Sequence, residues 1–202
     1  SRYEIKAMRK AARIAAAAHK RAMQACRPGL MEYQLEAELV YEFMREGARS
    51  PAYSSIVGGG ANSCILHYTD NKAELKDGDV VLIDAGAEYD SYASDITRTF
   101  PVNGVFSNAQ KDIYEVVLEA QLAAIEAVQP GNHWNDPHQA AVRVITEGLV
   151  SLGILKGRVR SLIKDHAYAK YYMHRTGHWL GMDVHDVGDY KLDGEWRMLE
   201  PG

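Results

Sequence analysis

Two aspartates in neighbouring apolar segments have the spacing most suggestive of chemistry. Asp84 ends the run Val-Val-Leu-Ile-Asp, and Asp95 opens the run Asp-Ile-Thr-Arg-Thr-Phe. If these segments form a hairpin that turns at Tyr89 and Asp90, Asp84 lies directly opposite Asp95. Facing side chains in an antiparallel pair have Cβ atoms about 4.5–5.5 Å apart, so two half-buried carboxylates there need a shared cation or a shared proton. The pair therefore predicts a site for a hard ion such as Mn²⁺, Mg²⁺ or Ca²⁺. In the alternative interpretation, one aspartate faces solvent and the other caps a turn.

A second candidate site is the segment 173–186, which holds three of the eight histidines of the chain: His174, His178 and His185. Imidazoles gathered among aspartates and glycines are candidates for metal ligation and proton transfer. His174 and His178 have the His-x-x-x-His spacing, but Arg175 and not Glu follows the first of them, so the helical zinc-protease motif is absent. The alternative is that all three are ordinary surface or core histidines.

The other histidines carry weaker signals. His67 follows the three glycines at 58–60, where it could reach a substrate or serve only in a turn. These glycines do not form a phosphate-binding loop, because no Gly-Lys-Ser/Thr follows them. The remaining four are expected to be ordinary surface or helix-face side chains: His19, His133, His138 and His166.

The elements that must position these residues alternate between helical and extended patterns. Apolar residues at helical spacing predict helices over residues 3–25, 32–46, 107–128 and 136–152. Branched and aromatic residues predict strands over 80–87 and 92–101, with turn residues between them. Gly47 is expected to cap the second helix, and Asp136 to open the last.

A weak internal repeat relates the two halves of the chain. A helix, a Pro-Gly pair, a second helix and a glycine stop occur twice, around Pro28-Gly29 and Pro130-Gly131. The repeat predicts an α/β domain with pseudo-twofold symmetry and a sheet that holds the site. Chance similarity between two helical hairpins is the alternative.

Composition excludes several classes of protein. The 202 residues include 23 Lys and Arg against 27 Asp and Glu, and 47% are apolar. Such a chain can bury a core, and its mildly acidic balance disfavours a nucleic-acid binder. No apolar run approaches the ~20 residues that span a bilayer, and the first residues do not resemble a signal peptide. Two cysteines, Cys26 and Cys64, are too few for a disulfide-stapled secreted scaffold. A soluble cytoplasmic protein is therefore expected.

Several motifs occur in a characteristic order along nearly the whole chain. The most specific are Leu-Ile-Asp-Ala-Gly at 82–86, Asp-Ile-Thr-Arg-Thr-Phe-Pro-Val-Asn-Gly at 95–104 and His-Trp-Leu-Gly-Met-Asp-Val-His-Asp-Val-Gly at 178–188. With these motifs the chain resembles the bacterial-type aminopeptidase P (Xaa-Pro aminopeptidase) family of pita-bread metallopeptidases, family M24. The resemblance implies an α+β pita-bread fold, in which pseudo-twofold helix-helix-strand repeats surround a curved antiparallel sheet. It also implies that residues 1–202 are a partial catalytic domain, without the family's N-terminal domain and C-terminal glutamate-bearing strands.

The resemblance further implies a site with two divalent metal ions, most commonly Mn²⁺, held by two Asp, one His and two Glu. Asp84, Asp95 and His178 match the first three ligands. His67 matches a histidine that binds substrate, and His174 and His185 match histidines that act on the substrate or the tetrahedral intermediate. In the family, the two ions share an activated hydroxide that attacks the scissile carbonyl.

This sequence departs from the family pattern in two places. Arg175 stands where the family often has glycine, and it is expected to alter the substrate entrance. The two glutamate ligands, one of which is the family's proposed general base, belong to segments that follow a Leu-Glu-Pro-Gly like that at 199–202. Glu200 therefore matches this earlier motif and is not expected to be a ligand.

The function implied by the resemblance is a metal-dependent aminopeptidase that removes the first residue from peptides with proline second. Its partner is that peptide; no nucleic acid or membrane is expected, and a homo-oligomer is compatible with the sequence. The nearest alternative is a prolidase or another pita-bread hydrolase, such as methionine aminopeptidase or creatinase. An alternative of another class is a module that has lost its metals and binds peptides or proteins, although all three ligands expected within this sequence are present.

Overall fold

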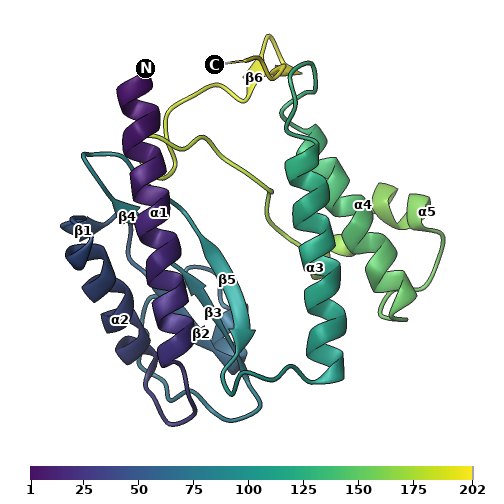
Figure 1. Ribbon diagram of the computed structural model, residues 1–202. Coiled ribbons are helices and arrows are strands. Elements are labelled where there is room, and N and C mark those ends of the chain that lie inside the picture. The colour runs from purple at the N-terminus through teal and green to yellow at the C-terminus, as the bar shows by residue number, and fades with distance from the viewer. Residues whose placement is uncertain (202) are drawn as a thin grey trace. The chain divides into compact units, whose positions relative to one another are not determined.

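The computed structural model describes residues 1–201. They form two compact units, the first made of residues 1–107 with 179–187, and the second of residues 108–178 with the segment from 188 onward. Figure 1 traces both along the chain. Each unit contains helices and short antiparallel strands, as the α+β class predicts.

The helices of the first unit are α1 (Arg2–Ala25) and α2 (Glu32–Arg45), close to the predicted ranges. After α2, Gly47 has a φ of +97°, which glycine adopts without a steric penalty. This turn of the backbone lets the Ala48 N–H donate to the Phe43 carbonyl at 2.9 Å. The expected glycine cap is therefore confirmed.

The main sheet of the first unit is antiparallel with the order β2-β3-β5. Its strands are β2 (Ile56–Gly59), β3 (Val80–Asp84) and β5 (Thr97–Pro101). A smaller pair joins β1 (Ser50–Pro51) to β4 (Ala87–Glu88), and the 3₁₀ turn η1 (Gly60–Cys64) follows β2.

Both helices of the first unit pack on this sheet and enclose its core, as Figure 1 shows. The helices contribute small and branched side chains at helical spacing, which allow a close approach. The buried cluster includes Ile14, Ala15, Ala18 and Ala22 from α1, Leu35, Leu39 and Phe43 from α2, and Val57, Val81 and Ile83 from the sheet. The sheet is thereby fixed at the strand ends that carry the aspartates.

The register of the hairpin differs from the prediction by two residues. Asp84 pairs with Thr97 and not with Asp95, because the turn lies at Asp90 and Ser91. Both turn residues have positive φ, +49° and +66°, as a two-residue type I′ turn requires, and this turn matches the twist of the flanking strands. Side chains alternate along a strand with a period of two, so an even shift keeps the expected face.

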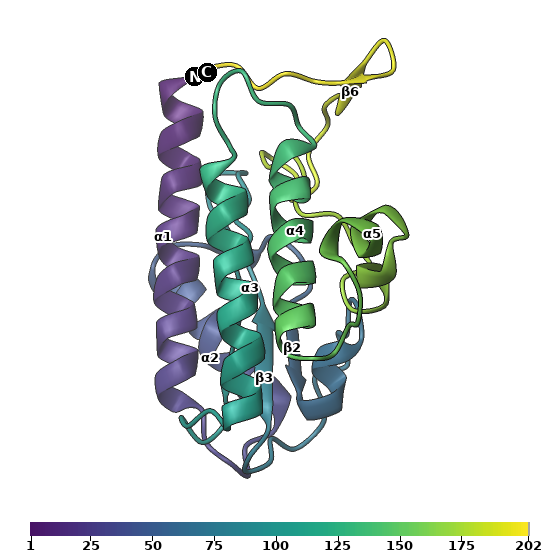
Figure 2. The same ribbon diagram turned by 90° about the vertical axis from the view of Figure 1, so that its right-hand side faces the viewer.

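The second unit is built on the helices α3 (Asn108–Glu126) and α4 (Asp136–Ser151), close to the predicted ranges. Figure 2 shows them side by side, and a Cβ at Gly148 would lie 2.5 Å from Val116, so glycine permits this close contact. The N-cap position of α4 is Asn135, one position before the expected Asp136, and its side chain makes no capping hydrogen bond. The smaller elements are α5 (Val159–Lys164), the 3₁₀ turn η2 (Ala167–Lys170) and the hairpin of β6 (Lys191–Leu192) and β7 (Glu195–Trp196).

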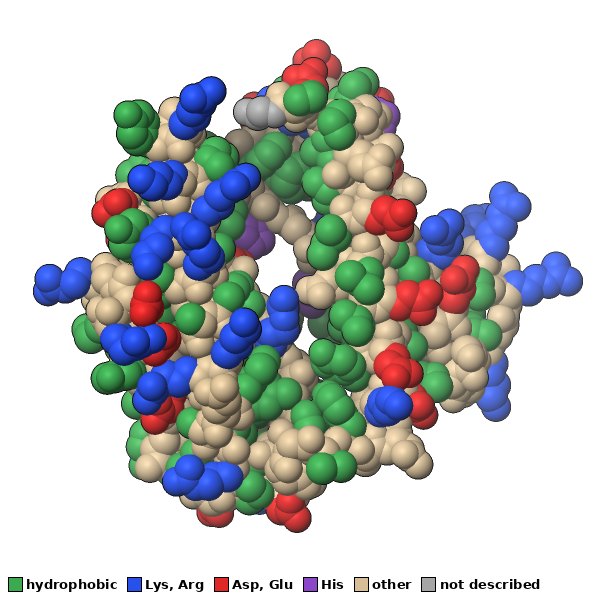
Figure 3. Space-filling model, viewed as in Figure 1, with side chains coloured by type: hydrophobic (Ala, Val, Ile, Leu, Met, Phe, Trp, Pro, Cys, Tyr) green, Lys and Arg blue, Asp and Glu red, His purple; other side chains and the backbone are tan. Residues whose placement is uncertain are grey.

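The outer face of α1 is basic. Five exposed cationic side chains lie on one side of the helix: Arg2, Lys6, Arg9, Arg13 and Lys20. Figure 3 shows Lys and Arg side chains gathered over this helix. Neither α1 nor any other helix within residues 1–201 is long and apolar enough to cross a membrane.

Candidate metal centre

The two predicted aspartate ligands converge on one hydroxyl group. The Tyr53 hydroxyl lies 2.5 Å from Asp84 Oδ1 and 3.1 Å from Asp95 Oδ1. The distance between Asp84 Oδ1 and Asp95 Oδ1 therefore cannot exceed the sum of these two distances. All three side chains are half-buried. Burial and the two carboxylates raise the pKa of Tyr53 far above its usual value, so the phenol keeps its proton and acts as a donor.

The electrostatics of the pair favour a cation. Burial raises the pKa of Asp84, and the charge of Asp95 raises it further, although hydrogen bonds from Tyr53 and Thr97 act in the opposite direction. A divalent ion between the carboxylates would remove this repulsion, and carboxylate oxygens are ligands that Mn²⁺ and Mg²⁺ prefer. The donor set in this unit therefore fits a metal ion of the expected kind.

A close approach of two backbone segments brings Tyr53 to the aspartates. A Cβ at Gly86 would lie 1.7 Å from the Ser94 carbonyl oxygen and 2.9 Å from the Tyr53 ring. Only glycine therefore fits between the two Asp-bearing segments. The Gly86 carbonyl also accepts from the Ala52 N–H at 2.8 Å, which holds the residue before Tyr53 against the segment between β3 and β4.

The histidine-rich segment is divided between the units. His185 lies in residues 179–187, which belong to the first unit, and this segment is anchored by a bond of 2.8 Å from the Ala93 N–H to the Gly181 carbonyl. The segment 179–187 therefore lies beside Ala93, two residues before Asp95. His174 and His178 belong to the second unit. There His174 is exposed, its ring lies edge-on to Tyr172 at 4.9 Å, and His178 is half-buried.

The structure therefore brings together two of the three expected ligands, Asp84 and Asp95. Within residues 1–201, no three His, Cys, Asp or Glu side chains are gathered closely enough to hold a metal ion. The assignment of His178 to the same centre stays a prediction.

The loop that carries His67 is held by a buried carboxylate that the sequence did not reveal. Glu32 is fully buried at the start of α2, and its Oε1 accepts from the Gly59 N–H at 2.8 Å and from Asn62 at 3.0 Å. Its Oε2 accepts from the Tyr68 hydroxyl at 2.8 Å and from the Ala73 N–H at 2.9 Å.

These four hydrogen bonds decide the charge of Glu32. Burial by itself raises the pKa of this carboxyl, but the four donors together hold it below its usual value. Glu32 is therefore ionised and fastens both ends of the loop. His67 stands within this loop, exposed and with a φ of +56°, so its backbone conformation depends on that anchorage.

Two other residues differ from expectation or had no signal in the sequence. His19 is only 3% exposed, because it lies on the inner face of α1 and not on the surface. Its Nδ1 donates to the Ala15 carbonyl at 2.9 Å, and burial lowers its pKa. Tyr53 had no recognisable signal, because it contacts residues 31 and 42 positions away in the chain. Only the three-dimensional fold brings it to the aspartates.

The sequence model of metallopeptidase family M24 matches residues 6–202. The chain belongs to this family. Over 199 residues it is 55% identical to the Xaa-Pro aminopeptidase of Haemophilus influenzae, a match that covers 98% of this chain and 46% of that protein. It is 41% identical over 204 residues to the human Xaa-Pro dipeptidase, covering 98% of this chain and 41% of that one.

The structure of Pseudomonas aeruginosa aminopeptidase PepP superposes on the whole chain with a TM-score of 0.99 and 64% identity. The match covers 46% of that protein, so this chain spans about half the length of the relatives that it matches. The predicted family and the predicted fold are thus confirmed. The metal ligands and substrate residues stay predictions.

Proposed function

We propose that the protein to which this chain belongs is a metal-dependent Xaa-Pro aminopeptidase, which releases the first residue of peptides that have proline second. The observation that carries the proposal is the convergence of Asp84 and Asp95 on Tyr53 in a member of a metallopeptidase family. The identity of 55% to an Xaa-Pro aminopeptidase supports the substrate class.

The proposed cofactor is a pair of divalent ions, most commonly Mn²⁺ in the family, with Asp84, Asp95 and His178 among the ligands. When bound, such ions supply an activated water and polarise the scissile carbonyl. The remaining chemistry falls to the chain's own side chains. The Tyr53 hydroxyl lies within hydrogen-bond distance of both carboxylates, donates to one of them at a time and so helps to orient the pair.

His67, His174 and His185 are the proposed substrate residues. A neutral imidazole can donate from one ring nitrogen and accept at the other, which suits it to orient a peptide group and to move a proton near neutral pH.

A cytoplasmic location is part of the same proposal. Cys26 and Cys64 are both free thiols, which supports a reducing compartment.

The test is an assay of the full-length protein loaded with Mn²⁺. An Xaa-Pro aminopeptidase releases the first residue from a longer Xaa-Pro-Xaa peptide, whereas a dipeptidase cleaves the Xaa-Pro dipeptide. The 41% identity to a dipeptidase makes this the alternative worth separating. Binding of the peptides without hydrolysis of either would favour the metal-free binding module and overturn the proposal.

A further inference from the structure

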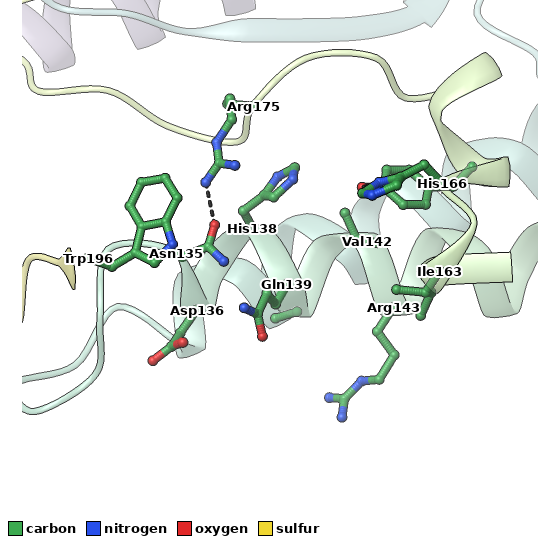
Figure 4. Close-up of a pocket in the computed structure, with 12 residues that line it drawn as sticks. Asn135, Asp136, His138, Gln139, Val142, Arg143, Ile163, His166, Arg175 and Trp196 are labelled. Carbon is green, nitrogen blue, oxygen red and sulfur yellow. Dashed lines mark hydrogen bonds between the residues drawn. The ribbon is translucent and has the colours of Figure 1, made fainter. Parts of the chain in front are cut away.

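Asparagine side chains join separate segments of the chain in each unit. In the second unit, Asn135 accepts from Arg175 beside a cavity of about 640 Å³, as the dashed line in Figure 4 marks. This cavity belongs to the second unit and Asp84 and Asp95 to the first, so the expected effect of Arg175 on the substrate entrance stays a prediction. In the first unit the joining residue is Asn71, which lies in the loop that Glu32 anchors.

The Asn71 side chain makes three hydrogen bonds of 2.9 Å. The residue is only 2% exposed. Its Oδ1 accepts from the Val57 N–H, and its Nδ2 donates to the Ser55 carbonyl and to Glu36 Oε2. A side-chain amide has two N–H donors and one acceptor oxygen, so both donors and the acceptor are used. The amide thereby joins the loop to helix α2 and to strand β2.

Two of these bonds lie beside the strand residue that pairs with Asp84. That residue is Ile56, and Ser55 and Val57 flank it. Strand β2 lies at the edge of the sheet β2-β3-β5, and the N–H and C=O groups on the outer side of an edge strand have no strand partner. Asn71 supplies a donor and an acceptor to this edge, as a neighbouring strand would. It therefore holds β2 in place opposite Asp84.

The same side chain fixes the loop on which it lies. The four bonds of Glu32 fasten this loop to the start of α2, whereas Asn71 also fastens it to the sheet. His67 precedes Asn71 by four residues, and Tyr53, which contacts both aspartates, precedes Ser55 by two. Without the amide, a buried N–H and a buried carbonyl of the strand segment would lack partners, and the loop would lose its direct link to β2.

We propose that Asn71 is a positioning residue of the aminopeptidase, which holds the loop that carries His67 against the edge of β2 opposite Asp84. It thereby fixes a substrate residue relative to a metal ligand. Asn71 acts through the backbone of the loop and of β2, and not on the reacting atoms. The proposal rests on the aminopeptidase function and adds to it a residue outside the ligand and substrate sets.

The experiment uses Asn71→Gly in the full-length protein. Asn71 has a φ of +46°, which glycine adopts without strain, so this variant removes the amide and keeps the backbone conformation. Calorimetry should show a Kd for Mn²⁺ that is about fivefold to tenfold higher. Kinetics with Xaa-Pro-Ala at saturating Mn²⁺ should show a KM about tenfold higher and a kcat less than about threefold lower. A residue that only stabilises the fold would leave the Kd and the KM of the folded protein unchanged.

Asn103→Gly is the matched control, because Asn103 joins two segments at the opposite end of the same sheet. Its Nδ2 donates to Asp77 at 2.8 Å, and its Oδ1 accepts from the Val105 N–H at 3.0 Å. It follows the end of β5 that pairs with the start of β3, whereas Asp84 ends that strand. Its loss should leave the Kd for Mn²⁺ and the KM within about twofold of the wild-type values.

A second variant tests the same link with less disturbance. Asn71→Asp combined with Glu36→Gln reverses the donor and the acceptor of the bond to α2. The Val57 N–H keeps its acceptor, but the Ser55 carbonyl loses its donor. The Kd for Mn²⁺ and the KM should both rise about threefold to fivefold. This variant decides the question if Asn71→Gly does not fold.

The proposal is overturned if either the Kd for Mn²⁺ or the KM stays within about twofold of wild type in the folded Asn71 variants. Failure of the aminopeptidase function would look different, because even the wild-type protein would then release no first residue. The calorimetry would still report whether Asn71 affects the metal site.

Discussion

Asp84 and Asp95 share one hydrogen-bond donor, the Tyr53 hydroxyl, at 2.5 and 3.1 Å. A phenol has a single proton, so it donates to only one carboxylate at a time. Two half-buried negative charges with one donor between them are unfavourable unless a cation or a second proton joins them. The geometry of this pair therefore links the stability of the protein, its response to pH and its affinity for metal.

The first prediction concerns Tyr53→Phe. The variant removes the shared donor and keeps the ring, so the free energy of unfolding of the metal-free protein should fall by about 1–3 kcal/mol. Adding Mn²⁺ should narrow the difference in the free energy of unfolding between Tyr53→Phe and the wild type, because the ion neutralises the two carboxylates. Urea denaturation with and without Mn²⁺ measures both effects. Tyr92→Phe is the control, because its hydroxyl donates to the exposed Glu4 at 2.9 Å and its loss should cost less than about 0.5 kcal/mol.

The second prediction concerns the pH dependence of the metal-free protein. Burial and the charge of Asp95 raise the pKa of Asp84, so the folded protein keeps this proton where the unfolded chain has lost it. The contribution of Asp84 to stability must therefore fall as pH rises from the ordinary value of 3.8 through the raised one. Asp95→Asn removes one cause of the shift and should make this decline smaller. Denaturation of both proteins at a series of pH values tests the sign, and an equal or steeper decline in the variant would contradict it.

The third prediction concerns metal binding and activity. Protons compete with metal at Asp84, so the apparent affinity for Mn²⁺ should fall as pH falls through the raised pKa of this group. Asp95→Asn keeps the shape of the side chain and loses an anionic ligand, so the full-length enzyme should lose its Mn²⁺ affinity and its hydrolysis while it stays folded. The matched control is Asp90→Asn in the exposed hairpin turn, where asparagine tolerates the positive φ. If Asp95→Asn retains activity and metal content, Asp95 is not a ligand.

The sequence predicted the helices and the aspartate pair because both depend on short-range patterns. The helical stripes that pack on the sheet recur every three or four residues, and Asp84 and Asp95 are only eleven positions apart, across a single turn. The exact register was wrong by two residues, because Asp90 and Ser91 adopt positive φ without the glycine that normally signals such a turn. The even shift left both aspartates on the expected face.

The rest of the site was not predictable from local patterns. Tyr53 and Glu32 act through contacts with residues about 30 to 40 positions away, and neither belongs to a motif with a fixed spacing. Glu32 resembles any exposed helix-start acid in the sequence, where Asp and Glu are common. Its burial depends on how the loop after β2 folds back onto α2.

The last prediction concerns Glu32 and the loop that it anchors. Glu32→Gln replaces one acceptor oxygen with an amide that presents N–H groups to two buried donors, so the free energy of unfolding should fall by about 2–4 kcal/mol. The pKa of Glu32 is held below its usual value, so its stabilising effect is complete at neutral pH and declines as pH falls through that lowered value. The difference in unfolding free energy between Glu32→Gln and the wild type should therefore shrink on acidification.

Glu38→Gln is the control: Glu38 pairs with Arg21 at 2.5 Å in a partly exposed position, so its loss should cost less than about 1 kcal/mol at any pH. Since the loop carries His67, Glu32→Gln should also raise KM more than it lowers kcat in the full-length enzyme, and an unchanged KM would show that the anchorage is structural and does not position a substrate residue.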